Sequence, residues 1–483
     1  MRVCLLLALL WFPAFPQSEP PQGRQYLQEM ITDREATGSG PLSLQQVIAS
    51  VKANFPPLLT ALQEREAADA NLLSAEGRFD TVLRARGDLN RLGYYSNERV
   101  DVSVDQPLQW QGLSLYSGYR LGEGSYPYYD GYYQTRSLGE WRAGLKLPLL
   151  RGRETDSRRT ELQKAKIGQR LADLSIDGQK ITIVQAASRR YWDWVAAGRR
   201  YVAIQNLLKI ARTRETFLEE SVNLGQLPAI EVTDNKRAIF QREAQLAEAG
   251  RALQQAAIEL SLYYRDSAGQ PIILTAADLP AVIPEPRQYD ESKLEEDVRA
   301  ALEQRPEIAR LQRQNEQLQQ DLKLAKNDQL PQIDLFTTFY TDSGVGPAYV
   351  STREWKSGVA FEFPVQRRIA KGRQAALSAQ QEQLKLRTGY AADGIKADVQ
   401  DAASALSQAY RRTEAAQDGV AATRQVEEAE RLRYDLGEGT LFILNLRELA
   451  TAEAEIRLIN AKADYQRAVA QYDYALANAL SNW

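Results

Sequence analysis

The side chains that could carry out chemistry in this chain are mainly carboxylates, amines and phenols. Its 483 residues include no histidine and one cysteine, together with 63 Asp and Glu residues and 60 Lys and Arg residues. Without histidine, the chain cannot form a Ser-His-Asp or Cys-His catalytic centre or an imidazole-ligated metal site. A carboxylate pair of the glycosidase type is the main remaining arrangement for acid-base catalysis. The spacing of the acidic residues indicates no such pair. We therefore expect no enzymatic activity, no catalytic residues, no cofactor and no metal site.

Charge and hydropathy exclude two further classes of protein. The formal net charge of -3 provides no excess of Lys and Arg for the phosphates of a nucleic acid, so we expect no nucleic-acid partner. The mean hydropathy is -0.45. After the N-terminus, no apolar run reaches the roughly 18 residues of a membrane-spanning helix, which excludes a helical membrane protein.

The N-terminus predicts export. Residues 1–17 have one positive charge followed by a short apolar stretch, which is typical of a secretory signal peptide. The alternative, a buried N-terminal helix, conflicts with Pro13 and Pro16. Residues 18–41 are expected to form an N-terminal extension. Cleavage near residue 17 would remove Cys4, so disulfides cannot stabilise the mature chain.

Proline placement predicts very long helices. No proline lies between Pro148 and Pro228 or after Pro364, and both stretches are rich in strong helix formers. Apolar residues in the first stretch recur with an average spacing near 3.5, the coiled-coil period. A helix from Arg153 to Leu224 would be about 105 Å long at 1.5 Å per residue. The sequence therefore predicts rod-like helices that are too long to fit within a compact globular domain.

In two other regions, about 80–150 and about 331–366, apolar and polar residues alternate with a period of two. In the first, Val100, Val102 and Val104 alternate with polar residues. The expected strands lie near Thr81–Asp88, Arg99–Gln106, Leu113–Leu121 and Glu140–Leu149 in the first region, and around Ile333 and Val359 in the second. Amphipathic strands accompanied by Tyr and Trp are typical of a transmembrane β-barrel. A soluble sheet with a tyrosine-rich loop is the alternative, and the strands alone leave both open.

An internal repeat organises the chain. Leu44–Pro56 matches Leu294–Pro306 at a constant offset of 250 residues, and the strand at Trp141 recurs at Trp355. The break Asn223-Leu224-Gly225 recurs as Asp435-Leu436-Gly437. Each half is then expected to contain helix, strands, long helix, glycine turn and long helix. The predicted domains are a first repeat over 42–270, a linker or equatorial element over 271–292, and a second repeat over 293–483.

The order and duplication of these motifs resemble the TolC-like outer membrane efflux proteins, the outer membrane factor family, from about Leu42 to Leu480. The resemblance implies a mainly α fold with membrane β structure: a trimeric α-helical barrel of long coiled-coil helices, continuous with a shared transmembrane β-barrel. It implies a passive exit duct of a tripartite efflux pump or a type I secretion system. The expected location is the outer membrane of a Gram-negative-type bacterium, with a large periplasmic portion.

The same resemblance implies the partners. They are two further copies in a homotrimer, a periplasmic adaptor (membrane fusion) protein, an inner-membrane transporter of RND, ABC or MFS type, and outer membrane lipid. A structural coiled-coil protein of the periplasm is the alternative, and it would leave the amphipathic strands without a purpose.

The first repeat has about twice as many residues in its strand region as the second. We expect four strands there and two in the second repeat, with a short turn at Gln111-Gly112 and a long loop from Gly122 to Leu138. Six strands per chain would give a barrel of 18, against 12 in a typical family member. The alternative, in which the additional hairpin packs outside the barrel or caps it, stays open.

Each long helix must reverse at a glycine turn, where glycine supplies backbone freedom. In the resembled family these turns form the periplasmic tip that meets the adaptor. The tip residues expected to dock the adaptor are Asn223, Leu224, Gly225, Asp435, Leu436, Gly437 and Gly439.

The resemblance also places a pore constriction near the tips. Tyr434 matches the tyrosine of the family and Glu231 matches one acidic site, while Ile443 and Leu446 occupy the acidic positions of the second repeat. We therefore expect a partly apolar constriction. Its candidate residues are Tyr434, Glu231, Asp234 and Glu438. These residues could alternatively be caps and surface positions of a turn.

Overall fold

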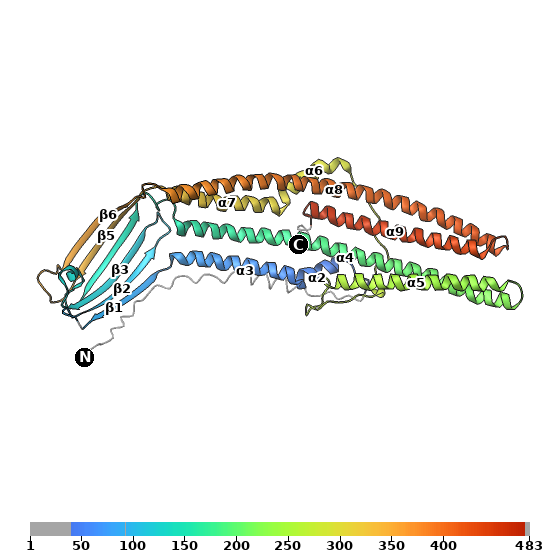
Figure 1. Ribbon diagram of the computed structural model, residues 1–483, viewed down its shortest axis with the longest axis horizontal. Helices are drawn as coiled ribbons and strands as arrows, with labels where there is room; N and C mark the ends of the chain where they lie inside the picture. Colours follow the sequence, from blue (N-terminus) through green and yellow to red (C-terminus); the bar gives the residue numbers. More distant parts are fainter. Residues whose placement is uncertain (1–39, 92, 479–483) are drawn as a thin grey trace.

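The computed structural model describes residues 40–91 and 93–478. The predicted signal peptide and most of the predicted N-terminal extension lie outside the described residues. A curved sheet forms one end of an elongated molecule, and long helices run from it to the other end (Figure 1). In the described part of the chain, no helix combines the length and the apolar character needed to cross a membrane.

The helices occur in two similar series, and in each series two helices precede a strand region and two longer helices follow it. The first series is α2 (Leu44–Asn54), α3 (Pro56–Glu76), α4 (Ser157–Asn223) and α5 (Ala229–Ser261); the second is α6 (Leu294–Gln304), α7 (Pro306–Asn327), α8 (Arg368–Asp435) and α9 (Leu441–Ala475). The longest, α4 and α8, have 67 and 68 residues, or about 100 Å each. The prediction of long helices in the proline-free stretches is confirmed.

Local sequence explains where these helices begin. The Asp156 side chain accepts a hydrogen bond from the backbone N–H of Arg159 and so caps α4. Pro56 and Pro306 occupy the first turns of α3 and α7, where a missing backbone N–H costs nothing.

Six antiparallel strands form one sheet in the order β1-β2-β3-β4-β5-β6. The strands are β1 (Val82–Asn90), β2 (Asn97–Pro107), β3 (Ser114–Gly124), β4 (Glu140–Pro148), β5 (Gln332–Asp342) and β6 (Arg353–Glu362). Of the two possibilities left open by the sequence, the additional hairpin belongs to this sheet, because β2 pairs with β3 and β4 pairs with β5. The outer edges of β1 and β6 have no partner strand among the described residues.

The register divides the sheet into an apolar and a polar face. Val102 lies opposite Tyr119, which lies opposite Trp141, so the apolar positions of neighbouring strands fall in line. The apolar face includes Leu83, Val100, Val104, Leu145, Leu147, Leu335, Phe339, Trp355, Val359 and Phe361. Trp355 and Phe361 are 75% and 67% exposed. Large side chains on this face are therefore not covered by the other residues that the structure describes.

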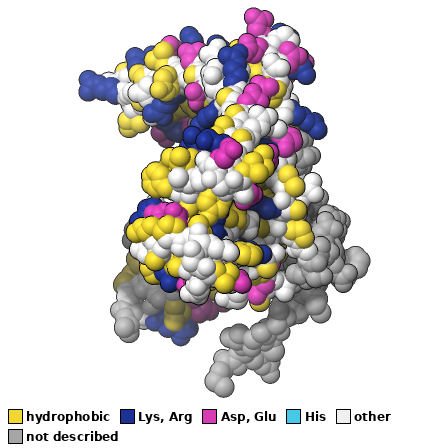
Figure 2. All heavy atoms as spheres, turned by 90° about the vertical axis from the view of Figure 1, so that its right-hand side faces the viewer, with side chains coloured by type: hydrophobic (Ala, Val, Ile, Leu, Met, Phe, Trp, Pro, Cys, Tyr) yellow, Lys and Arg dark blue, Asp and Glu magenta, His cyan; other side chains and the backbone are white. Residues whose placement is uncertain are grey.

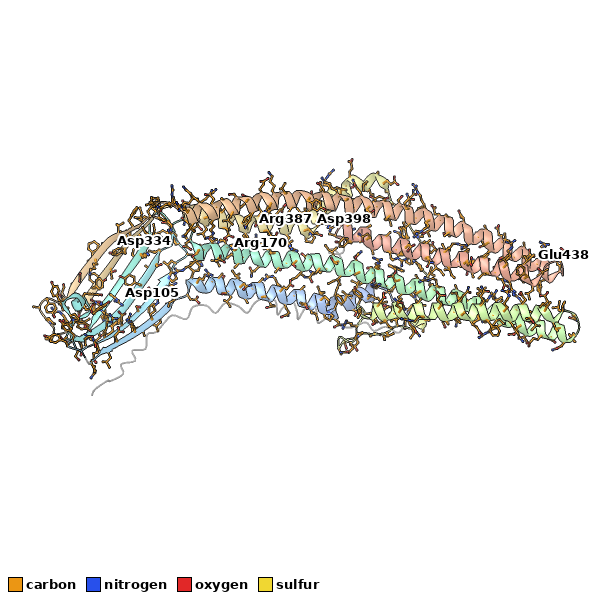
Figure 3. The ribbon with its side chains drawn as sticks, in the orientation of Figure 1. Asp105, Arg170, Asp334, Arg387, Asp398 and Glu438 are labelled. Carbon is orange, nitrogen blue, oxygen red and sulfur yellow. The ribbon has the colours of Figure 1, made fainter. Side chains whose placement is uncertain are left out.

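The polar face carries ion pairs between strands. Arg120 and Glu140 lie 3.0 Å apart, and Lys146 and Asp334 lie 2.8 Å apart. Further pairs on this face are Arg84–Asp105, Arg99–Asp88 and Arg142–Asp101. Asp105 and Asp334 mark this face in Figure 3.

The main hydrophobic core lies halfway along the helices, around the fully buried Trp194 of α4. Residues of α2, α3 and α5 pack on it, and the irregular segment 271–292 adds Leu279 and Ile283. At Gly198 of α4, a Cβ atom would overlap with the side chain of Leu279. The absence of a side chain at this glycine therefore lets the segment lie directly on the helix.

We predict that Gly198→Val displaces this segment and lowers the free energy of unfolding by about 1–3 kcal/mol, the usual cost of overpacking. Thermal unfolding of the detergent-extracted protein measures the loss. The double variant Gly198→Val/Leu279→Ala should recover part of it, because the smaller side chain makes room. Equal losses in the single and double variants would contradict the direct contact.

Candidate functional site

The two glycine turns lie together at the end of the molecule farthest from the sheet (Figure 1). The first connects α4 to α5 and the second connects α8 to α9. Glu438 marks the second turn in Figure 3. A view onto this end shows apolar side chains beside both positive and negative ones (Figure 2).

The two turns have the same backbone geometry. Gly225 and Gly437 have φ angles of 71° and 74°, the left-handed conformation that favours glycine. The N–H of Gly225 donates to the carbonyl of Val222 at 3.0 Å, and the N–H of Gln226 donates to the carbonyl of Ser221 at 2.9 Å. The second turn repeats this pattern from Gly437 to Tyr434 and from Glu438 to Arg433. Both helices thus end in a Schellman motif, which satisfies carbonyls that a helix end would otherwise leave free.

Gly439 has a different reason to be glycine. It is not among the residues with positive φ, but a Cβ atom there would lie 2.9 Å from the backbone nitrogen of Tyr434. Close approach of the chain, rather than backbone freedom, therefore excludes a side chain at this position.

Exposed apolar side chains project from both turns at matching positions. Leu224 follows α4 as Leu436 follows α8, and Ile230 and Phe442 lie at the start of the returning helices. All four are more than 60% exposed. Apolar side chains grouped in this way are typical of a surface that contacts another protein.

The predicted constriction residues are brought together only in part. Tyr434 is half-buried in the last turn of α8, and burial raises the pKa of its phenol. The charge of Glu231 in the first turn of α5 also raises this pKa, while Arg214 of α4 lowers it, so Tyr434 lies near both helices of the other hairpin. Asp234 pairs with Arg237 on its own helix at 3.0 Å. Glu438 is exposed in its turn.

A buried ionic cluster behind the tips was missed by the sequence analysis. Glu448 of α9 is 1% exposed, and it pairs with Arg242 of α5 at 3.2 Å and also with Arg214 of α4. Arg431 of α8 lies 3.6 Å away. One carboxylate thus receives cations from three other helices and connects the α4–α5 hairpin to the α8–α9 hairpin.

Neighbouring groups satisfy most of the remaining hydrogen bonds of this cluster. Asn445 accepts a hydrogen bond from Arg214 at 2.9 Å, and Arg242 donates to the carbonyl of Leu207, also at 2.9 Å. Burial lowers the pKa of Arg242, and the charge of Glu448 opposes that effect. The sequence did contain a signal, because Asn445 and Glu448 are polar residues on the face of α9 that also bears the buried Leu441 and Leu444.

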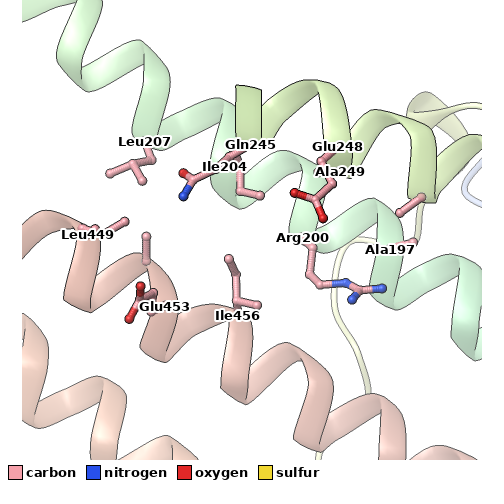
Figure 4. Close-up of a pocket in the computed structure, with 12 residues that line it drawn as sticks. Ala197, Arg200, Ile204, Leu207, Gln245, Glu248, Ala249, Leu449, Glu453 and Ile456 are labelled. Atoms are coloured by element: carbon pink, nitrogen blue, oxygen red, sulfur yellow. The ribbon is translucent and has the colours of Figure 1, made fainter. Parts of the chain in front are cut away.

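A pocket of about 230 Å³ opens between α4, α5 and α9, next to this cluster. Arg200, Glu248 and Glu453 contribute charged groups to its lining, and Ile204, Leu449 and Ile456 contribute apolar ones (Figure 4). This volume is below the roughly 300 Å³ at which ligand pockets begin. The pocket is a gap between packed helices, and nothing in its lining forms a nucleophile with an adjacent base.

We predict that Glu448→Gln loosens the tip, because Arg242 would lose its negative partner while staying buried. The expected loss of stability is about 3 kcal/mol. Hydrogen exchange should become faster in the tip halves of α4, α5, α8 and α9. Glu453→Gln is the matched control on the same helix, since its pair with Arg457 is exposed, and it should cost less than about 0.5 kcal/mol. Equal effects of the two variants would contradict a special role for the buried cluster.

Searches of the sequence against family models and against curated proteins give no match. Solved structures do match in fold. The Campylobacter jejuni CmeC outer membrane channel has 15% identity and a TM-score of 0.63, with 98% of this chain and 91% of that chain covered. The open state of the Neisseria gonorrhoeae MtrE outer membrane channel has 17% identity and a TM-score of 0.64, with coverage of 90% and 88%. The outer membrane protein VceC from Vibrio cholerae has 14% identity and a TM-score of 0.61, with coverage of 90% and 96%.

These similarities extend over nearly the whole chain and include both the sheet and the long helices. They confirm the predicted resemblance at the level of the fold: this chain has the architecture of a TolC-like outer membrane channel subunit.

Proposed function

From the fold that this chain shares with TolC-like outer membrane channels, we propose that it is the outer membrane exit duct of a tripartite efflux pump or a type I secretion system. The observation that carries the proposal is the six-stranded sheet with one exposed apolar face and one charged face, joined to helices about 100 Å long. The apolar face fits lipid, the polar face fits a water-filled pore, and the helices span a periplasm.

The open edges of the sheet support a homotrimer. Six strands are too few to enclose a pore, since the smallest barrels have about eight. An open edge in lipid would leave the backbone groups of β1 and β6 without hydrogen bonds. Three copies, joined from the β6 edge of one to the β1 edge of the next, would close an 18-stranded barrel with the ion pairs inside.

The tips support docking of a periplasmic adaptor. Their exposed leucines, Leu224 and Leu436, belong to turns of identical geometry, so the two repeats present similar surfaces to a partner. The docking set is Asn223, Leu224, Gly225, Asp435, Leu436, Gly437 and Gly439. An inner-membrane transporter of RND, ABC or MFS type would supply the cargo through that adaptor, and the duct itself would perform no chemistry.

Tyr434 and Glu231 are the constriction residues with the best support, since Tyr434 is half-buried in the last turn of α8 and the charge of Glu231 contributes to raising the pKa of its phenol. Asp234 and Glu438 remain candidate linings. The alternative, a structural coiled-coil protein of the periplasm, would use the long helices but would leave Trp355 and Phe361 exposed to water for no purpose.

We predict that a charge on the apolar face blocks membrane assembly, whereas a charge on the polar face does not. Val359 and Ala360 are neighbours on β6 and point to opposite faces. Val359→Arg should cost up to about 2–4 kcal/mol per chain in lipid and reduce the amount of heat-resistant trimer in the outer membrane fraction. Ala360→Arg would lie opposite Asp334 and should assemble normally. A soluble monomer of the unaltered chain, stable without detergent, would contradict the duct.

We further predict that Tyr434→Ala/Glu231→Ala widens the closed tip. The purified trimer in a planar bilayer should show a larger closed-state conductance and weaker block by divalent cations, since both a bulky ring and a carboxylate are removed. Tyr410→Ala/Glu414→Ala is the matched control, because it removes a hydrogen-bonded Tyr–Glu pair within α8, away from the turn. If both quantities stay unchanged in the tip variant, the constriction lies elsewhere.

A further inference from the structure

The long connection between β3 and β4 contains a short 3-10 helix, η2 (Tyr128–Tyr133), that folds back onto the sheet. The guanidinium of Arg99 lies 4.1 Å from the ring centroid of Tyr133, and that of Arg120 lies 5.7 Å from it. Arg120 also donates a hydrogen bond to the carbonyl of Tyr132 at 2.9 Å. The pairing register puts Arg99 and Arg120 on the polar face, together with Asp101 and Glu140. This loop therefore covers the polar face and not the apolar one.

The backbone of the loop is pinned to β3. Thr135 donates its N–H to the carbonyl of Gly122 at 3.0 Å, and its hydroxyl accepts from the N–H of Gly122 at 3.1 Å. A Cβ atom at Gly122 would clash with the carbonyl oxygen of Tyr133. Gly122 thus lets the loop lie flat against the strand.

The connection between β5 and β6 holds the same loop from the other side. The N–H of Ser137 donates to the carbonyl of Val345 at 3.0 Å, and the Arg136 guanidinium donates to the carbonyl of Val350 at 2.9 Å. Tyr349 is hydrogen-bonded to Gln134. The two loops form one braced unit at the end of the sheet opposite the helices.

Two tyrosines of this braced unit stay largely open to solvent, although the ring of Tyr132 packs on that of Tyr133 with their centroids 3.9 Å apart. Tyr128 is fully exposed and Tyr132 is 61% exposed. They differ from the aromatic residues that face lipid in a barrel, since Trp141 and Trp355 lie on the apolar face. Exposed rings above the polar face would project into the water-filled space of a closed barrel.

We propose that three copies of η2 form a tyrosine-lined constriction at the extracellular mouth of the pore, with Tyr128 and Tyr132 at its rim. The constriction rests on the proposed duct function, because it requires the polar face to line the pore. It lies at the opposite end of the molecule from the glycine turns, so it would limit passage independently of them.

Single-cysteine variants test this placement. Cys4 is the only cysteine, so a Cys4→Ser background makes every labelled thiol an introduced one. Tyr128→Cys and Tyr132→Cys trimers are treated in a planar bilayer with a thiol-reactive polyethylene glycol. The bulky polymer should reduce the conductance by about half or more. Tyr94→Cys is the control, because Tyr94 is 93% exposed but lies in the β1–β2 connection, outside η2.

The measurements are repeated in the Tyr434→Ala/Glu231→Ala background, so that a narrow tip cannot hide an effect at the mouth. Mass spectrometry confirms that each thiol is modified. Loss of conductance for positions 128 and 132, but not for 94, supports the constriction. A modified, conducting channel with unchanged conductance at positions 128 and 132 overturns it and leaves the duct intact. A chain that forms no conducting trimer overturns the duct, and the constriction with it.

Discussion

The alternation of polar and apolar side chains across six strands is the constraint on which the rest of this structure depends. A shift of one residue in any strand would move its charges to the apolar face. The pair Arg142–Asp101 shows how the register is reinforced, because Arg142 of β4 reaches across β3 to Asp101 of β2. It passes over Gly118, where a Cβ atom would lie 3.1 Å from the Arg142 guanidinium. Among residues 40–91 and 93–478, the same arrangement leaves the edges of β1 and β6 unpaired and the apolar face uncovered.

The helices show a similar exposure of apolar residues. Ile369 and Tyr390 on α8 and Phe240 on α5 are large side chains that the chain leaves exposed. Isolated exposed residues of this kind are ordinary, but here they recur along helices that also carry buried alanines on another side. Helices of coiled-coil period with two apolar sides are suited to packing between neighbours on both flanks. The exposed apolar residues of the sheet and of the helices therefore both fit the proposed homotrimer, in which neighbouring copies would cover them.

Much of this fold could be predicted from the sequence because its signals are local. The period of two at Val100 to Val104 and the absence of proline after Pro364 predicted elements whose observed ends differ by a few residues from those expected. The two glycine turns were also predictable, because a left-handed residue must end each helix. Whether the additional hairpin joined the sheet could not be read from the sequence, since that depends on the pairing of β2 with β3.

Two features of the candidate sites depend on contacts between distant residues, and sequence alone could not supply them. The place of Glu448 on the apolar face of α9 indicates that it is buried, but its partners Arg214 and Arg242 lie more than 200 positions away and cannot be read from the sequence. The tyrosine tract resembles a membrane-interface belt by composition, whereas the contact between Tyr133 and Arg99 assigns η2 to the polar face. In both cases the role of the residue depends on the side chain that it contacts, and the fold determines which side chain that is.

The two ends of the molecule therefore use ion pairs in different environments. At the sheet, several pairs are partly open to solvent, as at Arg84–Asp105, where each contributes about 0–1 kcal/mol and is screened by salt. At the tip, Glu448 and Arg242 are almost completely buried, so salt reaches them poorly and separating them costs several kcal/mol. The backbone hydrogen bonds of the strand register, more than these exposed ion pairs, then hold the sheet together. At the tip the charges themselves hold the hairpins, and any widening that separates α9 from α5 must provide a new partner for Arg242.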